Sequence, residues 1–306
     1  LICMRSIGVD IGTFSVKIAE IESSSKYARL VSYQEFPLSP DPNRDKRIEI
    51  IDIMRQVSQN WDISDTHVVM AIPQKNISLR RRAFPFRERH KILKSLAFEL
   101  EDDIPFSQDD AVFEAKITSF KGSQAYVLAL ACPKERVQDR ISLAQDCGLD
   151  LNTLSMEGAA VSSLIEYWQN PAPEEAATDS LTPDQYKADV WLSIGHENTL
   201  FNLFHNGQLI FTRSIDFGGK QIAEAIASQF HIHYLEALKE LQRKAFVLLN
   251  NEGATADQIK FSDTIRHAIE PLMQEVKLSL IEVKTDLRFE VKELHLLGGV
   301  SQIRNL

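Results

Sequence analysis

Apolar residues in two separate stretches of the chain, alternating with polar ones or glycine at Ile7, Val9 and Ile11 in the first, each predict a three-stranded meander. The predicted strands cover residues 7–11, 16–21 and 27–33 in the first stretch and 190–194, 200–204 and 209–211 in the second. The first strand of each set stops at a glycine, Gly12 or Gly195, and the turn Asn206-Gly207 is a strong hairpin signal. One plan that occurs twice predicts two similar halves.

The corner after the first strand has the residue types that suit a phosphate group. Gly12 lets backbone N–H groups approach an anionic oxygen, and Thr13 and Ser15 can add hydroxyl donors. Asp10 can hold a hydrated magnesium ion. Lys17 either pairs with phosphate or is a surface lysine on an edge strand. A tight turn without any ligand explains the same glycine, so both interpretations stay open here.

Between the meanders, a strand at 68–73 precedes a β-α-β-β-α unit. The predicted elements of this unit are a strand at 77–82, a helix at 88–102, strands at 111–120 and 125–132, and a helix at 134–147. Pro105 is a stop signal after the first helix, and Gly148 ends the second. We therefore expect a compact insertion within the first half.

The second half is predicted to be mainly helical after its meander. Helices are expected at 221–230, 235–249 and 261–288, with a break at 250–257 and with Pro271 kinking the last helix or ending a turn of it. Residues 171–187 are rich in Pro, Glu, Asp, Ala and Thr and have no apolar period, which predicts a linker or exposed loop.

Composition narrows the classes of function. With 306 residues, 44% hydrophobic and 25% charged, the chain can form two domains with substantial cores. Its net charge of −9 disfavours nonspecific nucleic-acid binding. No window is apolar enough for a membrane span and the start has no secretory signal, so we expect a cytoplasmic protein.

Cysteine and histidine do not form a convincing metal or disulfide pattern. Cys3, Cys132 and Cys147 are odd in number and widely spaced, which argues against a disulfide framework and against a CxxC metal site. The pair His231 and His233 lacks further ligands at suitable spacing, so a structural role is favoured for both.

Charge is polarised along one segment. Residues 80–94 carry a net charge of +6, and residues 99–114 carry −7. The predicted helix between them has cations at its start and acids at its end, which opposes the helix dipole and costs some tenths of a kcal/mol per group. Two explanations stay open: the charges pair with neighbouring elements, or they form a partner surface.

Taken together, the repeated glycine corners resemble those of the actin/hexokinase-like nucleotide-binding superfamily. Two later stretches are similar to its further motifs: residues 213–219 open a helix with Gly218-Gly219, and residues 294–301 look like an adenosine loop with Gly298-Gly299. Glycines are needed there so that base and sugar can lie against bare backbone. The resemblance implies two lobes that each offer one phosphate loop to a nucleotide.

A narrower resemblance rests on the insertion. The passage Phe98-Glu99-Leu100-Glu101-Asp102-Asp103-Ile104-Pro105-Phe106, an acid-rich helix that runs into an I-P-F corner, is similar to PilM-type and GspL-type proteins of type IV pilus and type II secretion machines. These proteins are relatives of the division protein FtsA. The match continues through residues 131–135, 147–149 and 155–157.

This resemblance implies an α/β, actin-like two-lobed fold of duplicated ribonuclease-H-like domains, with a small inserted α+β subdomain in lobe one. The expected bounds are 1–76 and 151–170 for lobe one, 77–150 for the inserted subdomain, 171–187 for the linker and 188–306 for lobe two. Because the chain stops shortly after Gly299, lobe two is expected to be incomplete at its C-terminus.

The resemblance also implies a site for ATP or ADP with magnesium. The positions expected to cradle the nucleotide are Gly12, Thr13, Phe14, Lys17, Gly195, His196, Gly218, Gly219, Gly298 and Gly299, with Asp10 on hydrated magnesium. Where related hydrolases place an acid or glutamine, this chain has Ser155. Glu157 is then the one catalytic candidate, and strand alternation would turn both side chains into the cleft.

Three departures from the family pattern weaken the expected chemistry. Ser193 stands where the second phosphate loop normally opens with Asp, so a catalytic metal site is doubtful. Residues 234–239 lack the A-E-x-x-K register, and Val300 replaces a glycine that is common in the adenosine loop. We expect weak nucleotide binding or a pocket that has lost it, and at most very slow ATP hydrolysis.

The favoured function is an actin-like scaffold of a pilus or secretion machine, peripheral to the inner membrane. The resemblance implies that it holds the cytoplasmic tail of a bitopic membrane assembly protein, the assembly ATPase, or both, and a homodimer is allowed. The alternatives are an active magnesium-dependent ATPase or kinase of the superfamily and an FtsA-like polymerising cell-division protein. The sequence does not separate pilus from secretion machinery.

Overall fold

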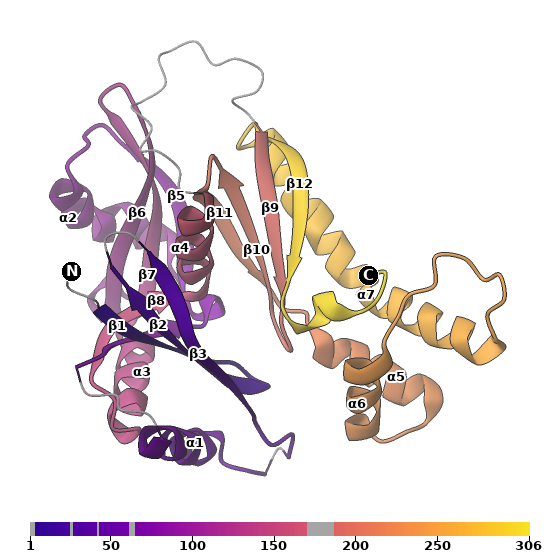
Figure 1. Cartoon of the computed structure of the whole chain (residues 1–306). Helices are drawn as coiled ribbons and strands as arrows, with labels where there is room; N and C mark the ends of the chain where they lie inside the picture. Colours follow the sequence, from indigo (N-terminus) through magenta and orange to yellow (C-terminus); the bar gives the residue numbers. More distant parts are fainter. Residues whose placement is uncertain (1–3, 25–26, 42, 61–64, 170–186) are drawn as a thin grey trace. The chain divides into compact units, whose positions relative to one another are not determined.

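A computed structural model describes residues 4–24, 27–41, 43–60, 65–169 and 187–306 (Figure 1). The chain divides into two compact units, residues 1–168 and 169–306. The predicted linker lies outside the described residues except for Lys187, which begins a strand. Among the described residues, no helix has both the length and the apolar character needed to cross a membrane.

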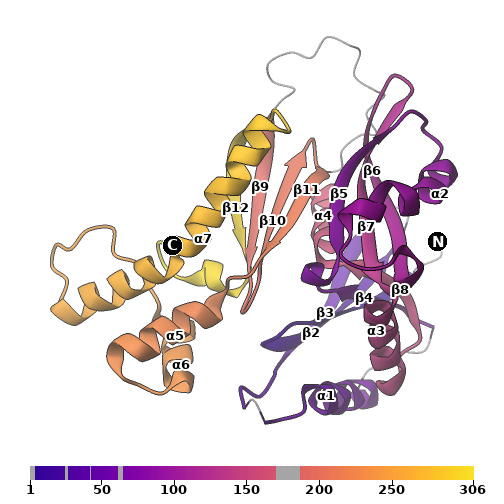
Figure 2. The same cartoon turned by 180° about the vertical axis from the view of Figure 1, so that it is seen from behind.

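The first unit is built on a mixed five-stranded sheet (Figures 1 and 2). Its strands in spatial order are β3 (Ala28–Pro37), β2 (Ser15–Ser23), β1 (Met4–Ile11), β4 (His67–Ile72) and β8 (Leu151–Met156). β1, β2 and β3 form the predicted antiparallel meander, while β4 and β8 extend the sheet in parallel with β1. Because β2 lies between two strands, Lys17 is not on an edge strand.

Alternation along the strands places the core of the first unit on one face of this sheet. Ile7 and Val9 point to the same face and are only 1% and 3% exposed. They belong to one cluster with Met54 of α1 (Lys46–Asn60) and Leu143 of α3 (Lys134–Asp146). Helix α4 (Glu157–Gln169) follows β8, and its residue Tyr167 accepts a hydrogen bond from the backbone N–H of Ala28 at 3.0 Å.

A second, smaller sheet lies within the first unit. Its order is β5 (Ser78–Phe84), β7 (Gln124–Pro133) and β6 (Ala111–Lys121), all antiparallel. Helix α2 (Arg89–Leu100) packs on this sheet through Ile92, Leu96 and Leu100, each 0% exposed. The sheet is tied to α4, because the Lys116 ammonium donates to the Ser162 hydroxyl at 2.7 Å.

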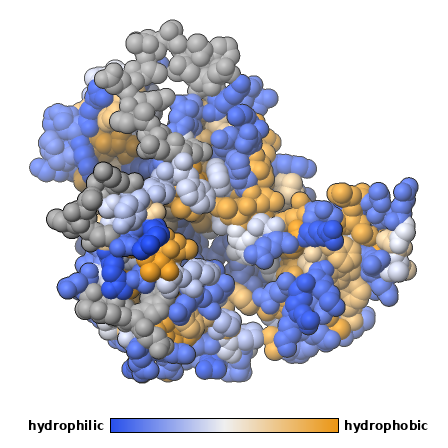
Figure 3. Space-filling model, viewed as in Figure 1, coloured by the Kyte–Doolittle hydropathy of each residue, from blue (hydrophilic) through white to orange (hydrophobic). Residues whose placement is uncertain are grey.

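Some of the polarised charges of this region pair with one another. Arg80 and Arg82 both form ion pairs with Asp103, and Arg89 pairs with Glu114 at 2.5 Å. The surface over α2 is mostly hydrophilic (Figure 3). Pairing with neighbouring elements therefore accounts for these five groups.

The second unit repeats the plan of the first with a four-stranded sheet. Its order is β11 (Gln208–Ile215), β10 (Thr199–His205), β9 (Lys187–Ile194) and β12 (Glu290–Leu297). β9, β10 and β11 are antiparallel, and β12 lies parallel to β9. The hairpin turn has positive φ at both central residues, 49° at Asn206 and 74° at Gly207. A two-residue type I′ turn requires this, as the sequence predicted.

Three helices follow the second meander, and their ends differ from the predicted ones. They are α5 (Gly219–Phe230), α6 (Tyr234–Lys244) and α7 (Ala256–Thr285). α6 stops at Lys244 because the chain beyond it pairs with the C-terminal segment, where the Val247 N–H donates to the Arg304 carbonyl at 2.8 Å. α7 begins earlier than expected, capped by Thr255, and continues through Pro271.

Candidate functional site

The first glycine corner joins β1 to β2 in a tight turn. The Gly12 N–H donates to the Ser15 carbonyl at 3.0 Å, and a Cβ atom at Gly12 would lie 3.2 Å from that oxygen. Thr13 is exposed at the tip, and the Phe14 carbonyl accepts from the Leu38 N–H at 2.8 Å. The Ser15 hydroxyl donates to Glu35 at 2.6 Å, so this predicted phosphate donor already has an acceptor.

Asp10 and Lys17 face each other across the same corner. They are register partners on β1 and β2, and the Lys17 Nζ lies 3.8 Å from the Asp10 Oδ2. The Asp10 side chain is 57% exposed, so this ion pair contributes little to stability. A magnesium ion on Asp10 would have to share the carboxylate with the ammonium group.

Glu157 occupies a different local structure from the one expected. β8 ends at Met156 and Glu157 is the first residue of α4, so the expectation that Ser155 and Glu157 alternate along one strand is wrong. The Glu157 Oε2 accepts from the Gln74 N–H at 2.8 Å, and the Gln74 side chain accepts from the Gly158 N–H at 3.2 Å.

The surroundings of Glu157 favour its protonated form. Burial raises the pKa of the Glu157 carboxyl, and the charge of Asp10 raises it further, against the Gln74 hydrogen bond and the charge of Arg140. Burial lowers the pKa of Arg140, against the charges of Glu157 and Asp10. Asp10, Gln74 and Glu157 all lie at the carboxyl ends of strands that run parallel, where ligands bind in many α/β folds.

In the second unit, the glycine corners touch one another. Gly195 follows β9, Gly218 and Gly219 open α5, and Gly298 follows β12. A Cβ atom at Gly218 would lie 2.4 Å from the His196 carbonyl oxygen, and one at Gly298 would lie 2.3 Å from that of Ile194. The predicted site residues of this unit are thus brought together, because only bare backbone permits such close approach. Gly299 has open space where a Cβ would be.

Much of the hydrogen-bonding capacity of these corners is used internally. The Gly219 N–H donates to the Gly195 carbonyl at 2.9 Å, and the Lys220 N–H donates to the His196 carbonyl at 2.8 Å. The Gly218 N–H donates to the side chain of Gln221 at 3.0 Å. Free N–H groups at a helix start are what make it an anion site. The start of α5 therefore offers few donors to a phosphate.

A polar cluster lies beside these corners. The Lys220 Nζ is 3.1 Å from the Glu197 carboxylate, and the Tyr234 hydroxyl is 3.3 Å from the His196 Nε2. Burial lowers the pKa of His196, which favours the neutral imidazole at neutral pH. His196 was expected from the sequence, whereas Tyr234, Glu197 and Lys220 were not.

Apolar side chains fill the space next to Gly219. A Cβ atom at Gly219 would lie 3.0 Å from Val300 Cγ2 and 3.8 Å from Leu241 Cδ2. Val300 and Leu241 are 7% and 8% exposed. Val300 and Leu241, the latter on α6, therefore occupy the side of Gly219 where a Cβ atom would lie.

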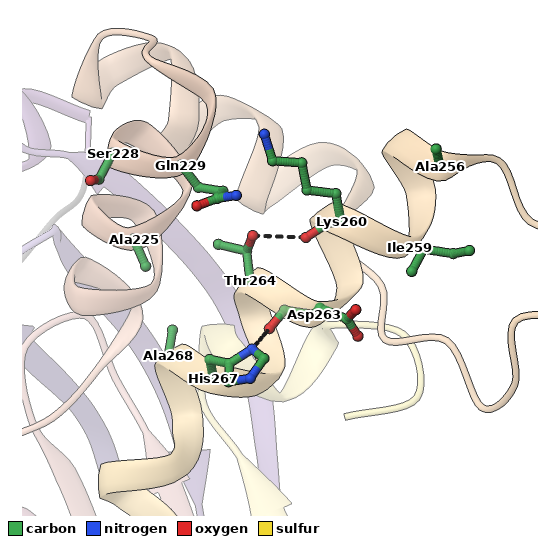
Figure 4. Close-up of a pocket in the computed structure, with 10 residues that line it drawn as sticks. All are labelled: Ala225, Ser228, Gln229, Ala256, Ile259, Lys260, Asp263, Thr264, His267 and Ala268. Atoms are coloured by element: carbon green, nitrogen blue, oxygen red, sulfur yellow. Dashed lines mark hydrogen bonds between the residues drawn. The ribbon is translucent and has the colours of Figure 1, made fainter.

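A separate groove lies between α5 and α7 (Figure 4). It encloses about 890 Å³ and is lined by Ala225, Ser228, Gln229, Ala256, Ile259, Lys260, Asp263, Thr264, His267 and Ala268. Within it, the Thr264 hydroxyl donates to the Lys260 carbonyl at 2.8 Å, and the His267 ring lies 2.6 Å from the Asp263 carbonyl (Figure 4). None of the predicted site residues lines this groove.

The suspected histidine pair has local structural roles. His231 ends α5 in the left-handed conformation, with φ of 54°. The His233 ring accepts a hydrogen bond from the Leu235 N–H at 3.3 Å and so caps the start of α6. Each histidine therefore has a place at a helix end.

Comparison with known proteins places the fold. The family model for type IV pilus assembly protein PilM matches residues 8–306. A solved PilM-PilN type IV pilus biogenesis complex contains a chain that is 22% identical, with a TM-score of 0.72, over 98% of this chain and 83% of the other.

More distant structures share the actin-like fold. MreB5 of Spiroplasma citri bound to ADP is 11% identical with a TM-score of 0.52, over 99% of this chain and 87% of the other. Ethanolamine utilization protein EutJ from Carboxydothermus hydrogenoformans is 16% identical with a TM-score of 0.51, over 98% of this chain and 78% of the other. The predicted fold class is confirmed.

Proposed function

The chain belongs to the PilM family of type IV pilus assembly proteins, and we propose that it acts as a scaffold on the cytoplasmic side of the inner membrane. In this role it holds the short cytoplasmic tail of a bitopic membrane assembly protein. The observation that carries the proposal is the likeness, over 98% of the chain, to a protein from a PilM-PilN complex. We propose the assembly ATPase as a second binding partner of this scaffold.

We propose that the tail binds along β6, as an added strand at the edge of the small sheet. β6 is an edge of this sheet, and its Lys116 contacts α4, so a tail there would reach both the small sheet and the rest of the first unit. An added strand gains backbone hydrogen bonds at such an edge and specificity from apolar anchors. Val112, which is 42% exposed on β6, offers an apolar contact.

Binding of a tail peptide tests this assignment. We expect a synthetic peptide of the assembly protein's cytoplasmic tail, labelled for fluorescence anisotropy, to bind the purified chain and to bind Val112→Asp at least tenfold more weakly. The matched control is Leu249→Asp, which changes an apolar residue that is 81% exposed in the second unit. No binding by the unmodified chain would contradict the scaffold proposal, and equal loss in both variants would contradict the β6 assignment alone.

We further propose that nucleotide binding is weak or lost. Support comes from the internally bonded start of α5, from Val300 and Leu241 beside Gly219, and from Ser193 in place of an acid. When bound, ATP with magnesium would supply a phosphoryl group and charge compensation near Asp10. Calorimetry with ATP and magnesium tests this, because a micromolar or tighter Kd would overturn it.

An active ATPase is the second candidate, and the arrangement around Glu157 favours it. Many catalytic sites contain a partly buried carboxyl whose pKa is raised, as burial and the charge of Asp10 raise that of Glu157. This candidate requires magnesium-dependent phosphate release that falls on Asp10→Ala. Phosphate release at the rate of a buffer blank would exclude it.

A further inference from the structure

Three side chains with metal-ligand atoms lie together on one face of the second sheet. They are Asp189 of β9 and Glu293 and His295 of β12, and their ligand atoms all lie within 4.8 Å of one another. The parallel register places Asp189 opposite Glu293 and Trp191 opposite His295.

A register irregularity brings Glu293 into this position. Ala188 pairs with Val291, but the next residue of β9, Asp189, pairs with Glu293, so Lys292 is an extra residue on β12. Such bulges re-aim side chains and are frequent next to functional sites. Without the extra residue, Glu293 would point to the other face.

The carboxylates of Asp189 and Glu293 lie opposite each other, so a cation between them would be stabilising. Like charges directly opposite each other on neighbouring strands are destabilising. Glu293 forms an ion pair with its neighbour, because the Lys292 Nζ lies 3.6 Å from the Glu293 Oε1. Asp189 has no salt bridge with a cation among the residues that the structure describes.

The imidazole of His295 is held in place beside the carboxylates. Its ring stacks on Trp191 with centroids 4.2 Å apart and an angle of 21° between the planes. Its Nε2 lies 3.4 Å from a Glu293 oxygen. The stacking fixes the ring plane, and Glu293 is exposed, so an ion can reach the group from solvent.

We propose that Asp189, Glu293 and His295 bind a divalent first-row transition metal ion, with zinc as the probe. One imidazole nitrogen and two carboxylate oxygens match the donors that zinc accepts, and three protein ligands leave a position for water. The ion would clamp the edge strand β12 to β9. Since β12 leads into Gly298 and β9 into Gly195, the clamp would stiffen the strands that carry two of the glycine corners.

Thermal melts of the full chain with zinc chloride test the site. After treatment with EDTA and its removal, we expect zinc to raise the Tm by several degrees and added EDTA to reverse the rise. Calorimetry should give one zinc ion per chain. Asp189→Asn, which keeps the size of the side chain, and His295→Gln should each lose most of the Tm shift.

His231→Asn is the matched control. It removes a histidine outside the site, and asparagine tolerates the left-handed conformation found there. This variant should keep the full Tm shift. If His295→Gln does not fold, Asp189→Asn still decides the matter. The proposal is overturned if zinc leaves the unmodified chain unchanged, if Asp189→Asn keeps the shift, or if His231→Asn abolishes it.

Discussion

Two glycines of the second unit, one at a corner and one between α6 and α7, are required for different reasons. Gly298 has φ of 86°, and a Cβ there would also lie 2.3 Å from the Ile194 carbonyl oxygen. Gly253 has φ of 72°, but nothing lies within 4 Å of the position of its Cβ. Gly298 is therefore needed both for its positive φ and for the close approach of another backbone segment, whereas Gly253 is needed for its positive φ alone.

This difference predicts unequal costs for the same substitution. Gly253→Ala should lose about 1–2 kcal/mol of the free energy of unfolding, the usual cost of a left-handed residue with a Cβ. Gly298→Ala adds a clash with backbone, so we expect a loss of about 3 kcal/mol or more. Urea denaturation followed by circular dichroism measures both, and equal losses would show that the clash at Gly298 relaxes.

Glu157 predicts a pH dependence of stability. Burial raises its pKa in the folded protein above the ordinary value near 4.5. A raised carboxyl pKa contributes stability that is fully present below the unfolded pKa and is lost as the pH rises through the folded pKa. Glu157→Gln cannot ionise and can still accept the Gln74 hydrogen bond.

The expected result is a stability difference that changes with pH. Relative to the unmodified chain, Glu157→Gln should gain stability as the pH rises above about 4.5, until the Glu157 carboxyl of the folded protein has ionised. Urea titrations at several pH values measure this difference. A constant difference over that range would mean that Glu157 has the same pKa in the folded and unfolded states.

Single residues of the candidate site could be predicted from the sequence where a glycine, which is uncommon in strands, follows a predicted strand. Gly12, Gly195 and Gly298 interrupt apolar runs, so the corners are visible in the sequence. Gln74 and Arg140 were missed because their place near Glu157 depends on packing between strands and helices distant in sequence. No local pattern marks such residues.

Elements were predictable where apolar runs and turn chemistry agree. The apolar runs and the Asn206-Gly207 turn between them identified the second meander, and both are local properties. The end of α6 was not predictable, because the pairing of Val247 with Arg304 competes with the helix. The start of α4 at Glu157 was missed since the strand pattern before it gives no stop signal.

The contact between β6 and α4 predicts how much stability the protein loses when a side chain that joins the two elements is replaced. Lys116 of β6 contacts both Ser162 and Glu166 of α4, and the Ser162 hydroxyl donates to Glu166 at 2.6 Å. Lys116→Met would leave Glu166 with a half-buried charge, so we expect a loss of about 1–3 kcal/mol. Lys121→Met, at the exposed end of the same strand, should change stability by less than about 0.5 kcal/mol.

Hydrogen exchange locates the effect of Lys116→Met. Faster exchange in β6 and α4, with α1 unchanged, would fit a tether that holds the small sheet to the rest of the first unit. Equal stability of Lys116→Met and Lys121→Met would show that the cluster adds nothing to the fold.

At the scale of the molecule, each unit carries its own sheets and its own buried side chains. The repeated strand plan and the division of contacts at residue 168 separate the buried residues of the first unit, among them Ile7 and Ile92, from those of the second, among them Phe201. The expected bounds of the inserted subdomain, 77–150, stay a prediction. Helix α3, within that range, packs with the core of the five-stranded sheet.

Separate cores predict that destabilisation stays within one unit. Because domains with their own cores can unfold independently, Gly298→Ala should lower the unfolding temperature of residues 187–306 and leave the first unit unchanged. Hydrogen exchange read by mass spectrometry should then show faster exchange in β9 and β12 and unchanged exchange in β1 and β4. The reciprocal variant, Lys116→Met, should affect only the first unit. Faster exchange in both units with either variant would mean that the chain unfolds as one cooperative body, since the loss in one core would then be felt in the other.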